Sequence, residues 1–168
     1  MANHHEPQSR IMKHESQGSL FGDAGQPGHA TSAIANIDGG SRGNPGPAAF
    51  GVYITVPDGP AIEVKGFLPH STNNVAEYNG LLAALRWAVE QRVTKLHIRA
   101  DSELLVKQMK GVYRVKNPGL LPLYEDAKRL ARQVGHVTFE HVRRELNKEA
   151  DRLCNEAMDE AARIKSEG

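Results

Sequence analysis

Residues 37–52 read IDGGSRGNPGPAAFGV, and the interpretation of this segment separates the candidate folds. Its glycines follow a single acid, Asp38, and lead into Pro45 and Pro47. A dinucleotide-binding fingerprint needs G-x-G-x-x-G opening directly into a helix, and a P-loop needs a Lys followed by Ser or Thr. Neither pattern is present, and the prolines and later β-branched residues favour a second strand. The segment therefore predicts a strand that ends at Asp38, a Gly/Pro turn and another strand.

The bulk composition is typical of one soluble domain. The 168 residues are 39% hydrophobic and 24% charged, and no apolar run is long enough to span a bilayer. The first residues lack the apolar core of a secretion signal. The single cysteine, Cys154, suits a reducing compartment, and its predicted helical stripe favours a packed thiol over a nucleophile. We expect a cytoplasmic monomer without a membrane segment.

Two regions differ along the chain. Residues 1–32 are polar, without apolar periodicity, and are expected to form a disordered tail. Within residues 33–168, β-branched and apolar runs predict strands at 33–38, 48–56, 61–68, 95–101 and 136–142. Helical spacing predicts helices at 73–92, 102–111, 118–133 and 147–167. This order describes an α/β domain whose mixed five-stranded sheet has three antiparallel strands, then parallel ones, covered by helices.

Apolar stripes identify the buried faces of two helices, and Ser102 is a candidate cap for a third. The stripe of the first helix is Tyr78, Leu81, Leu82, Leu85 and Val89. The stripe of the last helix is Ala150, Leu153, Cys154, Ala157, Ala161 and Ile164.

Four acids stand at predicted strand ends or helix beginnings. Asp38 and Asp101 end strands, and Glu77 and Asp151 lie in the first turns of helices. A layered α/β sheet places its ligands at such positions. Carboxylates without cysteine ligands suit hard cations such as Mg²⁺ or Mn²⁺, and four converging acids would repel one another unless neutralised. Taken singly, each acid is equally well explained as a turn, cap or helix-dipole residue.

Basic residues are concentrated in one part of the chain, although the net charge is only +1. Residues 86–116 contain eight basic and three acidic side chains. A solvated helix face is the ordinary explanation of such a run. A nucleic-acid surface becomes the better explanation if an acidic metal site lies nearby.

Four segments resemble, in order, the acidic motifs of type 1 ribonuclease H: IDGGSRGNPGPAAFG, STNNVAEYNGLLAAL, RADSELLVKQMKG and NKEADRLCNEA. The resemblance covers the chain from about residue 34 to the last helix and implies a ribonuclease H-like fold. It implies a metal-dependent endoribonuclease that cuts the RNA strand of RNA–DNA hybrids and leaves 5′-phosphate and 3′-hydroxyl ends. The implied cofactor is two Mg²⁺ ions, with Mn²⁺ as a substitute, held by Asp38, Glu77, Asp101 and Asp151.

The resemblance also implies contacts to the hybrid. Around the first turn and the first helix they are Gly39, Ser41, Arg42, Asn44, Thr72, Asn73 and Asn74, with Thr72 at the position of a DNA phosphate. Ordinary turn and N-cap chemistry is the alternative for these residues. The basic helix that some members use as a handle is absent, so its substitutes would be Lys107, Lys110, Arg114 and Lys116. We therefore expect weaker or more salt-sensitive hybrid binding.

The segment before the last acid departs from the family pattern. Many members have a mobile histidine there, whereas this chain has RRELN and no histidine between the last strand and Asp151. We expect His141, in the strand itself, to be packed. Arg144 is the proposed stand-in, and its role would be electrostatic because a guanidinium is not a base near neutral pH.

The tail contains QGSLF at residues 17–21, which resembles the peptide that docks bacterial proteins on the sliding clamp. Gln17, Leu20 and Phe21 would be its contacts, with the two apolar side chains in a pocket. One alternative function is therefore a non-catalytic hybrid-binding or clamp-tethered adaptor, which should have lost at least one acid. Another is a related nuclease of the same fold, such as a reverse-transcriptase-associated domain or a structure-specific DNase.

Overall fold

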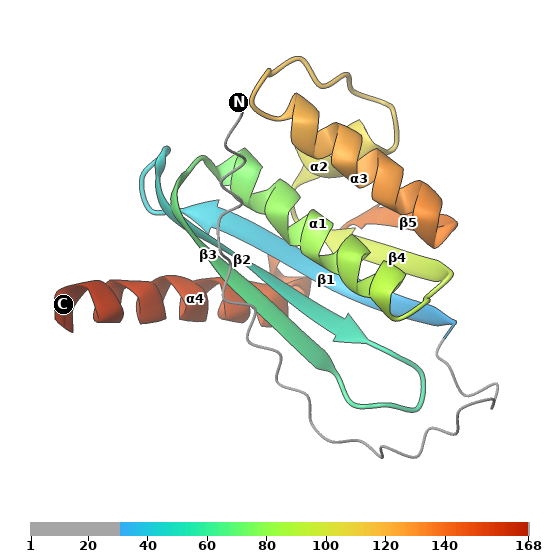
Figure 1. Cartoon of the computed structure of the whole chain (residues 1–168), viewed down its shortest axis with the longest axis horizontal. Coiled ribbons are helices and arrows are strands. Elements are labelled where there is room, and N and C mark those ends of the chain that lie inside the picture. Colours follow the sequence, from blue (N-terminus) through green and yellow to red (C-terminus); the bar gives the residue numbers. More distant parts are fainter. Residues whose placement is uncertain (1–30, 168) are drawn as a thin grey trace, which may run out of the picture.

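The computed structural model describes residues 31–167. The strands are β1 Ser32–Ser41, β2 Gly46–Thr55, β3 Ile62–Ser71, β4 Lys95–Ala100 and β5 His136–His141. The helices are α1 Asn73–Glu90, α2 Glu103–Met109, α3 Leu121–Val134 and α4 Lys148–Glu167, with a short 3₁₀ helix at Arg144–Leu146 (Figure 1). The candidate clamp contacts Gln17, Leu20 and Phe21 lie outside the described residues.

The strands form one mixed sheet in the order β3-β2-β1-β4-β5. β1 pairs antiparallel with β2, and β2 pairs antiparallel with β3. β4 is parallel to both β1 and β5. This arrangement confirms the predicted sheet, and it places the carboxyl ends of β1, β4 and β5 at the same edge.

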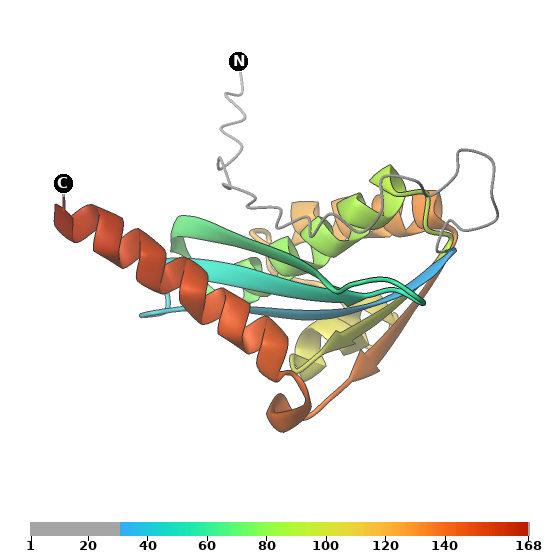
Figure 2. The ribbon, with the colours of Figure 1, turned by 90° about the horizontal axis from the view of Figure 1, so that it is seen from below.

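Helices cover both faces of the sheet. α1 and α3 lie on one face, and α4 crosses the opposite face (Figure 2). The core under α1 contains the predicted stripe residues Tyr78, Leu81, Leu82 and Leu85, each at most 1% exposed. Full burial of an apolar side chain contributes about 1.5–3 kcal/mol, so this stripe is enough to hold α1 against the sheet. Among the described residues, no helix has the length and apolar character needed to cross a bilayer.

The stripe of α4 is shorter than predicted. Ala150, Leu153, Cys154 and Ala157 are buried, but Ile164 is 59% exposed. The last turns of α4 extend beyond the sheet, so they have no apolar surface to cover (Figure 1). The Cys154 thiol donates to the carbonyl oxygen of Ala49 at 3.3 Å, and burial raises its pKa to about 12. The burial confirms the prediction that this thiol is packed in the core, and a raised pKa disfavours the reactive thiolate.

The first strand is longer than predicted, and Asp38 does not end it. β1 continues through the glycines to Ser41, which pairs with Ala48 of β2. Its pairing with β4 stops earlier, at Ile37 opposite Ala100. Asp38 therefore lies where β1 separates from β4 while remaining paired with β2. A strand tolerates glycine where another backbone approaches it closely. The sequence pattern did not indicate such an approach, so the predicted strand was too short.

Candidate active site

The four predicted acids line one cavity of about 520 Å³. Asp38 comes from β1, Glu77 from the beginning of α1, and Asp151 from the beginning of α4. Asp101 directly follows β4, and the next residue, Ser102, caps α2 by accepting from the Leu105 N–H at 3.2 Å. The cap confirms the prediction for Ser102, and it fixes the backbone beside Asp101.

Gly39 allows α1 to approach β1 directly beside Asp38. A Cβ at this position would lie 2.5 Å from the carbonyl carbon of Ala76 and from the nitrogen of Glu77. Real Cβ atoms do not approach backbone so closely, so only glycine permits this packing. The Gly39 N–H also donates to Asp38 Oδ1 at 2.9 Å. This glycine therefore brings two acids together rather than cradling a phosphate.

Gly51 has the same effect on the opposite face of the sheet. It is the β2 residue paired with Asp38. A Cβ there would lie 2.3 Å from the carbonyl oxygen of Ala150 and 2.7 Å from the nitrogen of Cys154. The first turns of α4, including Asp151, consequently pack directly on the β2 backbone.

Burial and mutual repulsion raise the pKa values of three of the acids. Burial is the largest cause for Asp38, and Asp101 and Asp151 add to it, so its pKa rises to about 8 although the Gly39 N–H opposes the shift. Burial raises the pKa of Glu77 to about 7, against the opposing effect of the Ser102 hydroxyl. Burial also raises the pKa of Asp101, and the Arg144 guanidinium is the largest opposing influence. The cavity therefore favours either protons or a bound cation.

The chemistry of these donors fits a hard divalent cation. All four are carboxylates, which are the ligands that Mg²⁺ and Mn²⁺ prefer. Across the described part of the chain, no group of three or more acidic, histidine or cysteine side chains is arranged so that it could hold a metal ion. Mg²⁺ commonly binds through one or two carboxylates while it keeps waters and substrate oxygens, so an incomplete protein cage is consistent with it.

Two side chains stand beside Asp101 at the entrance of the cavity. Arg144 Nε lies 3.8 Å from Asp101 Oδ2, and the Arg144 side chain is 85% exposed. His141 is also exposed and lines the cavity, with Nε2 3.2 Å from the Asp101 carbonyl oxygen. The prediction that His141 is packed is wrong, because β5 is an edge strand and its parallel register places His141 opposite Ala100. The place of His141 in the site follows from the β4–β5 register, which the sequence pattern does not give.

The predicted contacts Gly39, Ser41, Asn73 and Asn74 also line the cavity. Asn73 Oδ1 accepts from the Ser41 N–H at 2.8 Å and from the Ser41 hydroxyl at 3.2 Å. The Asn73 N–H donates to Asn44 Oδ1 at 3.1 Å. The turn after β1 is therefore tied to the beginning of α1.

Other predicted contacts have local partners or lie elsewhere. Thr72 caps α1 by accepting from the Val75 N–H at 3.3 Å, so its N-cap role is present in the structure. Seven predicted contacts do not line the cavity: Arg42, Asn44, Thr72, Lys107, Lys110, Arg114 and Lys116. Arg42 pairs with Asp159 of α4, and Lys107 pairs with Glu103. The last three are exposed around residues 110–120, where no helix separates α2 from α3, so the basic helix is absent as expected.

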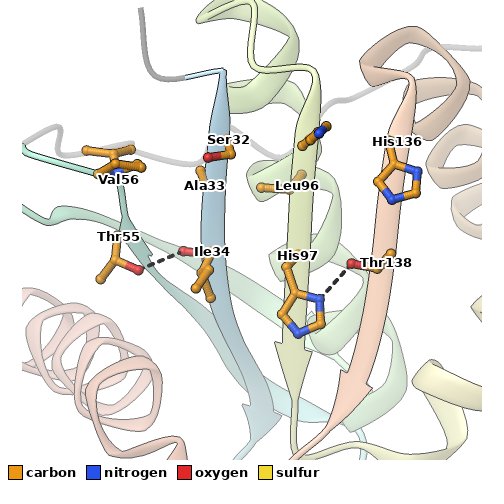
Figure 3. A pocket seen from close by; sticks show the side chains of 11 residues that line it. Ser32, Ala33, Ile34, Thr55, Val56, Leu96, His97, His136 and Thr138 are labelled. Carbon is orange, nitrogen blue, oxygen red and sulfur yellow. Dashed lines mark hydrogen bonds between the residues drawn. The ribbon is translucent and has the colours of Figure 1, made fainter. Parts of the chain in front are cut away.

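A second hollow, of about 420 Å³, lies at the opposite ends of β1 and β4. Ile34, Val56 and Leu96 contribute to its apolar lining, and His97 Nδ1 contacts Thr138 Oγ1 at 2.6 Å (Figure 3). None of the four acids lines this hollow. The acidic cavity is therefore the better candidate for chemistry.

Comparison with known proteins places the chain in a family. Residues 36–157 match the family described as "Reverse transcriptase-like". Ribonuclease HI of Halobacterium salinarum is 38% identical over 137 residues, which cover 81% of this chain and 69% of that protein. The chain belongs to the type 1 ribonuclease H family.

Solved members of the ribonuclease H family have the same fold. The N-terminal ribonuclease H domain of Rv2228c from Mycobacterium tuberculosis is 45% identical, with a TM-score of 0.75 over 80% of this chain and 98% of that one. LC11-RNase H1, solved in complex with an RNA/DNA hybrid, is 40% identical, with a TM-score of 0.73 over 77% and 99%. The complete mycobacterial relative is described as bifunctional, and this chain spans 36% of its length.

Proposed function

We propose that the protein is an endoribonuclease that hydrolyses the RNA strand of RNA–DNA hybrids. The observation that carries the proposal is the convergence of Asp38, Glu77, Asp101 and Asp151 on one cavity. Relatives named as ribonucleases H, one of them solved with a hybrid, support the choice of substrate. The adaptor alternative is disfavoured because all four acids are present and line the same cavity.

The proposed reaction is an in-line displacement that leaves 5′-phosphate and 3′-hydroxyl ends. The four acids would hold two divalent cations, Mg²⁺ or the substitute Mn²⁺, which when bound would supply an activated water and charge stabilisation at the leaving oxygen. Arg144, exposed beside Asp101, is positioned to attract the phosphate without accepting a proton. Because the acids alone would repel a phosphate, this cation at the entrance has an electrostatic role that a neutral residue could not perform.

The chain's other polar residues would hold the hybrid in place. Ser41 and Asn73 are joined to each other at the cavity wall, so they present a fixed set of polar atoms to a sugar-phosphate backbone. Asn44, which accepts from the Asn73 N–H, is a proposed contact in the turn beside this wall. Gly39 and Asn74 are proposed contacts on the cavity lining, and Arg42 and Thr72 are proposed contacts outside it. Lys107, Lys110, Arg114 and Lys116 would supply a second, more distant contact through phosphate charge.

The direct test is cleavage of an end-labelled RNA–DNA hybrid in Mg²⁺ and then Mn²⁺. Single-stranded RNA, duplex RNA and duplex DNA serve as competing substrates, and Asp101→Asn is the test variant. Asp126→Asn is the matched control, because Asp126 pairs with Arg129 on α3 and does not line the cavity. Extension of the products by a polymerase reports their 3′-hydroxyl ends.

We expect hybrid-selective cleavage that falls at least about a hundredfold in Asp101→Asn, more than is usual for an outer-shell partner of a metal, and persists in Asp126→Asn. Cleavage that survives Asp101→Asn would refute the assigned site. Hybrid binding without cleavage in either metal would refute the proposed activity and favour the adaptor.

A further inference from the structure

A buried asparagine, Asn147, joins strand β1, which carries Asp38, to helix α4, which carries Asp151. Asn147 is 1% exposed and immediately precedes α4. Its Nδ2 donates to the carbonyl oxygen of Ile37 at 2.8 Å, and its Oδ1 accepts from Asn36 Nδ2 at 3.0 Å. Both partners lie in β1, directly before Asp38. One side chain therefore connects the segment before Asp38 to the helix that carries Asp151.

The direction of this side chain differs from that of an ordinary helix cap. An asparagine before a helix commonly accepts a hydrogen bond from an N–H of the first turn. The two carboxamide hydrogen bonds of Asn147 instead go to β1. The Ile37 carbonyl can only accept, which fixes the orientation of the carboxamide. The side chain therefore positions α4 against the sheet rather than stabilising the helix end.

The backbone of Asn147 supports the same part of the site. Its carbonyl accepts the hydrogen bond from the Asp151 N–H at 3.1 Å, and its N–H donates to the Arg144 carbonyl at 3.0 Å. Movement of Asn147 would therefore displace Asp151 and the turn that carries Arg144 together.

The other interactions at the beginning of α4 do not hold it to β1 as the Asn147 hydrogen bonds do. Asp38 and Asp151 carry like charges when ionised and repel each other. Arg152 pairs with Glu63, Glu149 and Glu156, and of these only Glu63 lies outside α4, in β3. That ion pair holds α4 to the far edge of the sheet, whereas the Asn147 hydrogen bonds hold it to β1, at the point where pairing between β1 and β4 ends.

We propose that Asn147 is a positioning residue that sets the separation of Asp38 and Asp151 and thereby the affinity of the acidic cavity for divalent cations. The inference rests on the proposed function only in taking this cavity as the cation site. In this role Asn147 touches neither the cation nor the substrate. It acts by fixing two ligands, as outer-shell partners do in metal sites.

Calorimetric titration of the full chain with Mn²⁺, without hybrid, tests the proposal. We expect Asn147→Ala to bind Mn²⁺ about tenfold to a hundredfold more weakly than the unaltered chain, the range for outer-shell partners. Tyr78→Phe is the matched control, because it removes another buried hydrogen bond, from the Tyr78 hydroxyl to Gln108 Oε1 at 2.7 Å. This control should lose thermal stability but keep its Mn²⁺ affinity.

Asn36→Ala tests the same connection from the side of β1 and leaves α4 unaltered, so it serves if Asn147→Ala does not fold. It should weaken Mn²⁺ binding in the same direction by a smaller factor, because the Ile37 hydrogen bond remains. Unchanged Mn²⁺ affinity in the folded variants would overturn the proposal, as would equal weakening in Tyr78→Phe or no binding to the unaltered chain. Mn²⁺ binding without hybrid cleavage would refute the proposed function alone, and the comparison of variants would still decide the role of Asn147.

Discussion

At Asp38, the negative charge that a metal ligand needs lowers the stability of the metal-free fold. Its ordinary pKa of 3.8 rises to about 8 because burial and two neighbouring acids disfavour the charged form. Between these values the folded chain binds more protons at Asp38 than the unfolded chain does. The contribution of this group to the free energy of unfolding therefore falls as pH rises from about 4 to about 8.

Asp38→Asn should stabilise the metal-free protein at high pH, since it removes this charge. We expect a gain of about 1–2 kcal/mol in the free energy of unfolding at pH 8 and little difference at pH 4, after allowing for solvent screening. Urea denaturation in EDTA at both pH values measures it, with Asp126→Asn as the surface control. A difference from the unaltered chain that does not grow with pH would contradict this interpretation.

Divalent cations should reverse the destabilisation that the Asp38 charge causes in the metal-free protein. A ligand that binds only the folded state at a hundred times its dissociation constant stabilises that state by about 2.7 kcal/mol. Mg²⁺ or Mn²⁺ should therefore raise the melting temperature of the unaltered chain more than that of Asp38→Asn. Thermal unfolding with and without the metal checks this, and equal shifts in both proteins would place the cation outside the acidic cavity.

The close packing of α1 on β1 depends on the absence of a side chain at Gly39. Gly39 and Gly40 are neighbours in β1, but a Cβ at Gly40 would meet only Asn73 Oδ1 at 3.8 Å, whereas one at Gly39 would meet backbone at 2.5 Å. Backbone atoms of a packed helix cannot move aside as a flexible side chain can. The two glycines therefore differ in what an added methyl group would cost, although the sequence presents them as an identical pair.

Gly39→Ala should destabilise the protein by about 1–3 kcal/mol through overpacking and move α1, with Glu77, away from Asp38. Gly40→Ala should cost clearly less. Urea denaturation of both variants measures the difference, and hybrid cleavage by Gly39→Ala should fall as well. Equal stability of the two variants would mean that α1 can shift without cost, and would contradict the role of Gly39 in the packing of α1 on β1.

The molecule as a whole separates its charges. The acids meet in the cavity, while Lys110, Arg114 and Lys116 are exposed on the connection between α2 and α3. If this basic surface neutralises phosphates of the hybrid, its contribution should depend on salt and not on sequence.

Arg114→Gln or Lys116→Gln should weaken hybrid binding and reduce the slope of log affinity against log salt concentration by about one. Fluorescence anisotropy on an Asp101→Asn background, which prevents cleavage, measures that slope. Lys165→Gln is the control, because Lys165 is exposed in the last turn of α4, which extends beyond the sheet, and does not line the cavity (Figure 1). An unchanged slope in the two test variants would remove these residues from the hybrid interface.

Periodicity and motifs in the sequence predicted the order of elements, the mixed sheet and the family correctly, and they singled out four acids that the structure brings to one cavity. These features are local, because the alternation of a strand and the stripe of a helix are recorded in neighbouring residues. The length of β1 beyond Asp38, the exposure of His141 and the pairing of Arg42 with Asp159 were not predictable in this way. Each depends on strand register or on how closely two elements pack, as does the contact of Asn147 with Asn36 across 111 positions. Such contacts form only when the sheet and its helices assemble, so they were decided by the tertiary structure.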